Sequence, residues 1–293
     1  MSAKKRRRVV LDTDTYNEVD DQFALAHLLL SPDEVELEAV YAAPFFNDRA
    51  SSPADGMEKS YEEIVRVLDL VGGPRPPVLR GSTTYLPGAG IPVESPAAHD
   101  LVERAMATKS GERLYVAGIA VATNLASALL IEPRIADHIE IVWLGGHGPH
   151  WPDTREFNLQ QDIHAARVLL DSAAPLVLLP CWPVTSHLMV TVPELERYLA
   201  PQGKLGAYLT DIVRSHGNAS PGWSKQIWDI SACAWLVNPD WIHTREEPSP
   251  LLRDDLTWGD RTGRRPIRIA HGLNRDAIFA DFYAKAGRLG RGR

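Results

Sequence analysis

The chain has 293 residues, 44% of them apolar, and a formal net charge of −7. This length and composition allow a large buried core and exclude a chain that is disordered throughout. The negative charge argues against a nucleic-acid-binding protein, because neutralising phosphates requires a basic surface and the basic runs here lie at the two ends of the chain.

The small number of cysteines and the lack of long apolar runs further limit the class of protein. The two cysteines, Cys181 and Cys233, are too few and too far apart for a disulfide framework or a thiolate metal site. No run of about 18 apolar residues is present, and the basic start of the chain passes into an expected strand without a signal-peptide core. We therefore expect a cytoplasmic protein with neither a nucleic-acid partner nor a membrane partner.

Short aliphatic runs alternate with helical patterns along the chain. Strands are expected at 8–14, 35–43, 113–120, 138–146, 175–181 and 266–271, and helices at 20–32, 53–72, 123–133, 162–172 and 275–287. Strands that alternate with helices of this length indicate βαβ units. The expected fold class is α/β, with an open, mostly parallel, doubly wound (Rossmann-like) sheet flanked by helices.

Two segments lack such patterns. Residues 72–96 are rich in proline and glycine, residues 245–265 are polar, and both are expected to be irregular connections. Neither has the apolar content of a separate domain. The expected organisation is a basic disordered tail at 1–8, a single α/β domain at 9–286 and a basic C-terminal tail at 287–293.

The segment LDTDTYNEVDDQFAL, residues 11–25, places four aspartates and a glutamate at the end of the first expected strand. Carboxylates that leave water need a cation or a network of hydrogen-bond donors to compensate them. Open parallel sheets bind ligands outside the carboxyl ends of their strands. Residues 118–124, 145–158 and 180–185 also follow expected strands, and we expect all four segments to meet at one ligand site.

Three interpretations compete for the acid cluster. An EF-hand loop starting at Asp12 would have Phe23 in place of the bidentate glutamate and no glycine at its sixth position. The run VVLDTDT is similar to the nucleophile motif of haloacid-dehalogenase-type phosphotransferases, in which Asp12 would attack phosphate and Asp14 would act as acid and base. That family also requires a later acidic pair, and Asp254 and Asp255 follow no apolar strand.

The third interpretation accounts for more of the chain. DTD…DDQFAL resembles the N-terminal signature of the inosine-uridine-preferring nucleoside hydrolase family, DTDxGxDDAxAL, although two additional residues separate the acidic pairs and the glycine is missing. Three later segments resemble the same family in the same order: VAGIAVATNLASALL its GPLTNLA segment, TREFNLQQDIHAA its EFNxxxDPEAA stretch, and WDISA its HDPLA motif. Four ordered matches favour this interpretation.

The resemblance implies a nucleoside hydrolase fold and calcium-dependent hydrolysis of the N-glycosidic bond of a nucleoside-like small molecule, releasing base and ribose. It implies that calcium is held by Asp14, Asp21, Asp229 and the main-chain carbonyl of Thr123, with Asp14 also the base that activates water. It further implies contacts to the ribose from Asp20, Asn47, Glu156 and Asn158, and a homodimer or homotetramer. Calcium suits such a site, since it accepts carboxylates, carbonyls and hydroxyls as ligands.

The leaving base is the least well specified part of the site. Many family members have a histidine directly before the last metal aspartate, whereas this chain has Trp228. We hypothesise that the base is contacted by aromatic or imidazole groups from two segments. The first holds His147, His150 and Trp151, and the second holds His216, Trp223 and Trp228. The identity of the base, the acid that protonates it and the role of residues 16–18 stay open.

Two alternatives also stay open. The chain could keep the metal and ribose site only to bind a ribosyl ligand, with the longer acidic loop blocking the reaction. The phosphotransferase that uses Asp12 and Asp14 is the other alternative.

Overall fold

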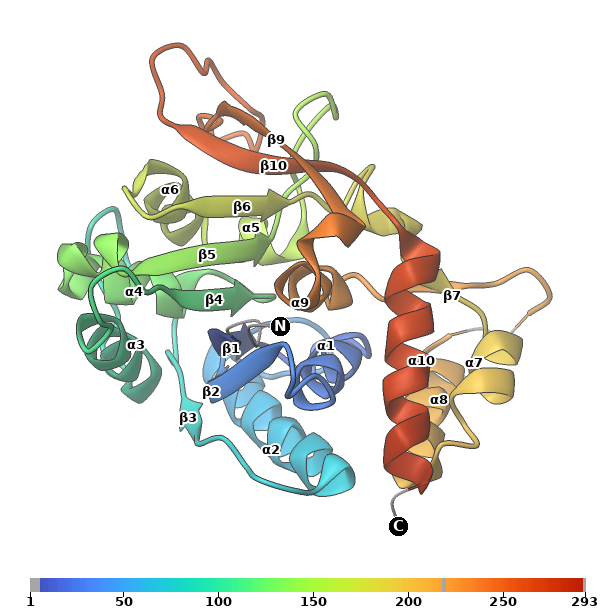
Figure 1. Cartoon of the computed structure of the whole chain (residues 1–293). Helices are drawn as coiled ribbons and strands as arrows, with labels where there is room; N and C mark the ends of the chain where they lie inside the picture. Colours follow the sequence, from blue (N-terminus) through green and yellow to red (C-terminus); the bar gives the residue numbers. More distant parts are fainter. Residues whose placement is uncertain (1–5, 218–219, 292–293) are drawn as a thin grey trace.

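A central eight-stranded sheet organises the molecule in a computed structural model that describes residues 6–217 and 220–291 (Figure 1). The strand order is β3-β2-β1-β4-β5-β6-β10-β9. These strands are β1 (Arg7–Thr13), β2 (Val35–Ala42), β3 (Val78–Arg80), β4 (Leu114–Gly118), β5 (Ile139–Leu144), β6 (Leu176–Leu179), β9 (Ile242–Pro248) and β10 (Pro266–Leu273). All neighbouring pairs are parallel except β9 and β10 at one edge. The predicted open, mostly parallel α/β fold is confirmed.

Helices cover both faces of this sheet. The α-helices are α1 (Asp21–Leu29), α2 (Pro53–Val71), α3 (Pro96–Met106), α4 (Thr123–Ile131), α5 (Phe157–Gln161), α6 (Ile163–Asp171), α7 (Val192–Tyr198), α8 (Gly203–His216), α9 (Ile230–Val237) and α10 (Arg275–Arg291). Helices α1, α2 and α9 pack together on one face, and α3, α4 and α6 pack together on the other. A short second sheet pairs β7 (Met189–Val190) with β8 (Lys225–Gln226). None of the described helices combines the length and apolar composition of a transmembrane span.

The central strand β1 explains why the acidic segment begins inside the protein. Val9 and Leu11 belong to the core on the α1 face, whereas Val10 belongs to the core on the α4 face. Successive side chains of a strand point to opposite faces, and a parallel sheet covered on both faces buries both sets. The strand therefore delivers the fully buried Asp12 to the carboxyl edge of the sheet.

Several predicted boundaries differ from the structure. Residues 72–96 contain the edge strand β3, and residues 245–248 belong to the antiparallel strand β9 rather than to a loop. Part of each predicted tail is regular structure, because β1 begins at Arg7 and α10 continues to Arg291. The Arg8 guanidinium lies 2.5 Å from a carboxylate oxygen of Glu38, which ties the start of β1 to β2. Residues 1–5 and 292–293 of the predicted tails lie outside the described residues.

Helix α2 lies against the segment that follows β2. A Cβ atom at Gly56 would lie 2.0 Å from the main-chain oxygen of Phe45, so the helix and this segment touch backbone to backbone. The helix begins at Ser52, whose side chain accepts a hydrogen bond from the Asp55 amide, as a helix-capping residue does. The close approach fixes the segment that carries Asn47.

We expect Gly56→Ala to lower the free energy of unfolding by about 1–3 kcal/mol, because the added methyl group must displace backbone. Glu62→Ala, a substitution of an exposed residue in the same helix, is the control and should change stability by less than about 0.5 kcal/mol. Urea unfolding of the two variants measures both values. Equal stabilities of the two variants would contradict the close approach.

Candidate active site

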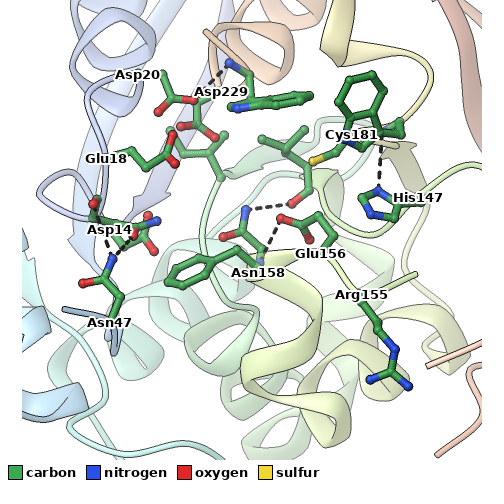
Figure 2. A pocket seen from close by; sticks show the side chains of 16 residues that line it. Asp14, Glu18, Asp20, Asn47, His147, Arg155, Glu156, Asn158, Cys181 and Asp229 are labelled. Carbon is green, nitrogen blue, oxygen red and sulfur yellow. Dashed lines mark hydrogen bonds between the residues drawn. The ribbon is translucent and has the colours of Figure 1, made fainter. Parts of the chain in front are cut away.

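A pocket of about 340 Å3 opens at the carboxyl edge of the sheet (Figure 2). Eight of the residues expected from the sequence line it: Asp14, Asp20, Asn47, His147, Glu156, Asn158, Trp228 and Asp229. They come from segments after β1, β2 and β5 and from the residues just before α9. The fold thus brings together four sequence segments that are far apart in the chain.

Three aspartates form a compact acid cluster beside the pocket. Asp20, Asp21 and Asp229 each offer a carboxylate oxygen within 4.8 Å of the others, and all three side chains are buried. Asp20 and Asp21 stand at the start of α1 and Asp229 at the start of α9. These two helices pack on each other, and both present the positive end of the helix dipole to the cluster.

Burial and mutual repulsion raise the pKa values of these carboxyls. Burial followed by the charge of Asp20 raises the pKa of Asp21 to about 7, even though the Thr13 hydroxyl donates a hydrogen bond of 2.5 Å to it. Burial and then the charges of Asp20 and Asp21 hold the pKa of Asp229 well above its ordinary value. Without a compensating cation, the cluster therefore favours bound protons over full ionisation.

Asp12 and Asp14 add two buried oxygens that have no partner. The Oδ2 atoms of both residues accept no hydrogen bond from the described part of the chain. Asp12 Oδ1 accepts a hydrogen bond of 2.7 Å from the Asn124 side-chain amide, so the Asn124 side chain orients Asp12. Burial raises the pKa of Asp12 to about 7, and burial with the charge of Asp21 raises that of Asp14.

The donor set fits a hard divalent cation. Buried carboxylate oxygens without hydrogen-bond donors, close to three further carboxylates, are the ligands that calcium prefers. Thr123 begins α4, and its hydroxyl donates a hydrogen bond of 2.7 Å to Asp162. Thr123 is not one of the described residues that line the pocket, and the metal contact expected for its main-chain carbonyl stays a prediction.

The opposite wall of the pocket is rigid and polar. Glu156 caps α5 and accepts hydrogen bonds from the main-chain amides of Asn158, Leu159 and Gly146. The side-chain amide of Asn158 donates a hydrogen bond of 3.1 Å to the carbonyl of Leu144 at the end of β5. Figure 2 shows Glu156 and Asn158 across the pocket from Asp20 and Asp229.

Aromatic side chains form one end of the pocket. Trp182 lines it beside Trp228, and the two indole rings meet at 67° with their centroids 5.8 Å apart. Trp151 does not line the pocket but stacks on Trp182, with ring centroids 5.8 Å apart and planes at 16°. Trp182, which the sequence analysis did not name, follows β6 at the same edge of the sheet.

Histidine placement differs from the expectation. His147 lines the pocket, whereas His150 is exposed and is not one of the described lining residues. Burial lowers the pKa of His147, and its Nδ1 accepts a hydrogen bond of 3.4 Å from the Trp182 amide. Trp223 lines a neighbouring cavity that it shares with Trp228, rather than the pocket itself.

The two additional residues of the acidic loop are ordered by contacts on both sides. The Asn47 side-chain amide donates a hydrogen bond of 2.7 Å to Asn17 Oδ1. The ammonium group of Lys225 donates a hydrogen bond of 2.6 Å to Glu18. The loop thus forms a wall of the pocket. Lys225 stands in no motif that indicated this contact.

This architecture defines an α/β enzyme that acts on a small polar ligand at the carboxyl edge of its sheet. A family model described as inosine-uridine preferring nucleoside hydrolase matches residues 9–280, and the chain belongs to this family. Family membership confirms the resemblance found in the sequence and the expected class, an N-ribohydrolase that hydrolyses the N-glycosidic bond of a ribonucleoside.

The relatives cover most of the chain. A pyrimidine-specific ribonucleoside hydrolase RihA from Salmonella enteritidis is 26% identical over 266 residues, which span 81% of this chain and 82% of the relative. Another RihA from an Enterobacter species is 27% identical over 265 residues, covering 80% of each chain.

Solved structures share the fold. A purine-preferring ribonucleoside hydrolase from Gardnerella vaginalis superposes with a TM-score of 0.79 at 23% identity, covering 98% of this chain and 100% of that one. An inosine-uridine preferring nucleoside hydrolase from Bacillus anthracis gives a TM-score of 0.76 at 19% identity, covering 96% and 99%. The acidic residues that a phosphotransferase would need, Asp254 and Asp255, are exposed and do not line the pocket.

We expect the chelated protein to lose stability as the pH rises from about 4 to about 7. Asp12 and Asp21 have pKa values of about 7 in the folded protein, above their ordinary value of 3.8. Their protons therefore stabilise the folded state at low pH, and this contribution is lost as the pH rises through about 7. Thermal unfolding in chelator and in calcium measures the effect. Each kcal/mol of lost stability should lower the melting temperature by about 2–4 °C.

Calcium should remove most of this pH dependence, because a cation favours the ionised carboxylates. Asp21→Asn should weaken both the pH dependence in chelator and the stabilisation by calcium, while Asp33→Asn, at an exposed position, serves as the control. A melting temperature in chelator that does not vary with pH would contradict the proton-sharing cluster.

Proposed function

We propose that the protein hydrolyses the N-glycosidic bond of a ribonucleoside in a calcium-dependent reaction that releases base and ribose. The observation that carries the calcium dependence is the buried acid cluster together with the adjacent Asp14, whose Oδ2 has no partner in the described part of the chain. Burial and mutual repulsion raise the pKa values of Asp14, Asp21 and Asp229. A hard cation is the simplest compensation for such a cluster.

Asp14, Asp21, Asp229 and the carbonyl of Thr123 would hold the ion. When bound, calcium would supply positive charge that makes a water more acidic and grips vicinal hydroxyls. Asp14 lines the pocket and carries the unpartnered oxygen, so it is the side chain that can take a proton from water. The water would then attack the anomeric carbon of the ribose.

The polar walls would hold the sugar between them. Asp20 Oδ2 accepts a hydrogen bond of 3.0 Å from the Trp228 main-chain amide, and Oδ1, 3.8 Å from the ammonium group of Lys225, would accept a ribose hydroxyl. Glu156 and Asn158, each fixed by backbone contacts, would take hydroxyls from the opposite side. Asn47, held by Asn17, would complete the cradle. An oxocarbenium-like transition state gains most from such preformed negative charge.

The leaving base would lie against Trp228 and Trp182. Stacking on an indole ring favours a flat heterocycle. His147 is the titratable imidazole on this wall of the pocket, and its Nδ1 acts as an acceptor toward Trp182. Its Nε2–H is then the group that can donate a hydrogen bond or a proton to the base. One relative is named for pyrimidine substrates and another for purine substrates. Similarity to relatives therefore does not identify the base that this protein releases.

A ribosyl-ligand binder without turnover is the second candidate, and the longer acidic loop is the observation that favours it. Asn17 and Glu18 from this loop line the pocket, where they could restrict the approach of water. A homodimer or homotetramer and a cytoplasmic location remain predictions of the family resemblance and the composition.

We expect ribose release from a panel of nucleosides in calcium and its loss in chelator. Asp14→Ala should reduce the rate by about 10²–10⁴-fold, because the general base is removed. Asp211→Ala, at an exposed position of α8, is the control and should keep the full rate of ribose release. Reducing-sugar assays measure each case. Stabilisation by calcium and ribose without any turnover would identify the binder instead.

Substrates with different leaving groups test whether His147 donates a proton to the departing base. We expect His147→Gln to slow nucleoside hydrolysis by about 10²-fold or more, as for loss of a general acid. The same variant should leave hydrolysis of p-nitrophenyl riboside almost unchanged, because nitrophenolate departs without a proton. His150→Gln is the matched control. Equal losses on both substrate types would show that His147 has no role as a proton donor.

A further inference from the structure

The longer acidic loop places an additional carboxylate in the pocket wall. Glu18 lines the pocket, and it also lines the neighbouring cavity formed with Trp223, Lys225 and Trp228. In Figure 2 its side chain lies on the same side as Asp20 and Asp229, across from Glu156 and Asn158. Glu18 therefore stands where the acid cluster meets the aromatic end.

Lys225 holds this carboxylate in place. Its ammonium group donates hydrogen bonds of 2.6 Å to Glu18 Oε2 and 2.6 Å to the carbonyl of Gln226, and it lies 3.8 Å from Asp20 Oδ1. The lysine is only 5% exposed. A buried ammonium that loses its partner is costly, so the pair restricts Glu18 to one orientation. Lys225 itself is fixed in β8, which pairs with β7.

The second oxygen of Glu18 is available to a ligand. Glu18 Oε1 accepts no hydrogen bond from any of residues 6–217 and 220–291. An ionised carboxylate can only accept hydrogen bonds, so the ligand group opposite it must be a donor. In the proposed function the ribose hydroxyls are already met by Asp20, Glu156 and Asn158. The donors that remain are on the base: ring N–H groups, which the oxo bases of inosine and uridine carry, and exocyclic amino groups, which amino bases carry in place of a carbonyl.

We propose that Glu18 is a specificity-determining residue that selects nucleosides whose base carries an amino group, and that Lys225 is its positioning residue. This inference rests on the proposed use of the pocket for a ribonucleoside. A base that carries a carbonyl in place of the amino group would bring its carbonyl oxygen, a hydrogen-bond acceptor, against the Glu18 carboxylate, which is also an acceptor. Such a mismatch leaves Glu18 Oε1 and the carbonyl facing each other without a donor between them, at a side chain that is 40% exposed before the ligand binds, and this disfavours the oxo base.

Binding of C-nucleosides tests the inference without turnover, because their carbon–carbon glycosidic bond cannot be hydrolysed in this way. Formycin A and formycin B differ by an amino group against a carbonyl, and pseudoisocytidine and pseudouridine form a matched pyrimidine pair. Isothermal titration calorimetry in calcium should give the wild-type protein an affinity about tenfold higher or more for the amino member of at least one pair.

Substitutions of Glu18 and Lys225 test whether these two residues cause the preference for amino bases. Glu18→Gln should reduce the ratio of the two dissociation constants to about 1–2, because the amide both donates and accepts. Glu58→Gln removes the carboxylate of an exposed pair with Arg80 and should keep the wild-type ratio. Lys225→Met should lower the ratio by freeing Glu18, and Lys225→Arg should restore it, which a purely structural role would not predict. If Lys225→Met does not fold, as circular dichroism would reveal, the Glu18→Gln result decides.

Three results would overturn the inference: wild-type ratios near one for both pairs, a Glu18→Gln protein that keeps the wild-type ratio, or no binding of any of the four compounds. Failure of the proposed function gives a different pattern. A wild-type protein that prefers the amino members but releases no ribose from adenosine, inosine, cytidine or uridine would refute hydrolysis and support the role of Glu18. Ribose release at equal kcat/KM within both amino and oxo pairs, with binding ratios near one, would support hydrolysis and refute the role of Glu18.

Discussion

Repulsion among buried carboxylates is the constraint on which the rest of the site depends. A core strand, β1, carries Asp12 and Asp14 to the centre of the sheet edge, and two helices that pack on each other bring Asp20, Asp21 and Asp229 beside them. The pKa values of about 7 for Asp12 and Asp21 reflect how unfavourable this arrangement is for ionised groups. The fold tolerates the arrangement because the core beneath it is extensive on both faces of the sheet, and a bound cation would turn the repulsion into attraction.

The parts of this picture that depend on local pattern could be predicted. The apolar run of β1, the helical pattern of α2 and the acidic segment are all visible in the sequence, and so is the order of strands and helices that brings the segments to one edge. The parts that depend on tertiary contacts could not. Trp182 faces the pocket because of the turn after β6, and Lys225 reaches Glu18 across more than 200 residues of sequence. Neither Trp182 nor Lys225 belongs to a sequence pattern that predicts its contacts.

The choice between two histidines shows the same limit at short range. His147 and His150 lie three residues apart in one loop, and only the first lines the pocket. The loop is turned by the Thr154 hydroxyl, which accepts a hydrogen bond of 2.9 Å from the His147 amide, and by the Trp258 indole, which donates one of 2.9 Å to the His147 carbonyl. Trp258 belongs to the polar segment that was expected to be an irregular connection, and most of that segment is indeed irregular. Such a distant contact decides which imidazole faces the substrate.

The two outermost strands limit how copies of the protein can meet. At one end of the sheet β3 has only three residues, and Pro76 and Pro77 precede it. At the other end β9 carries Arg245, Glu246 and Glu247 and ends at Pro248. Short strands, charges and prolines at a sheet margin prevent continuation of the hydrogen-bond ladder into a neighbouring molecule. The two edges of the central sheet are therefore poor templates for pairing with another copy, which limits amyloid-like extension of this sheet.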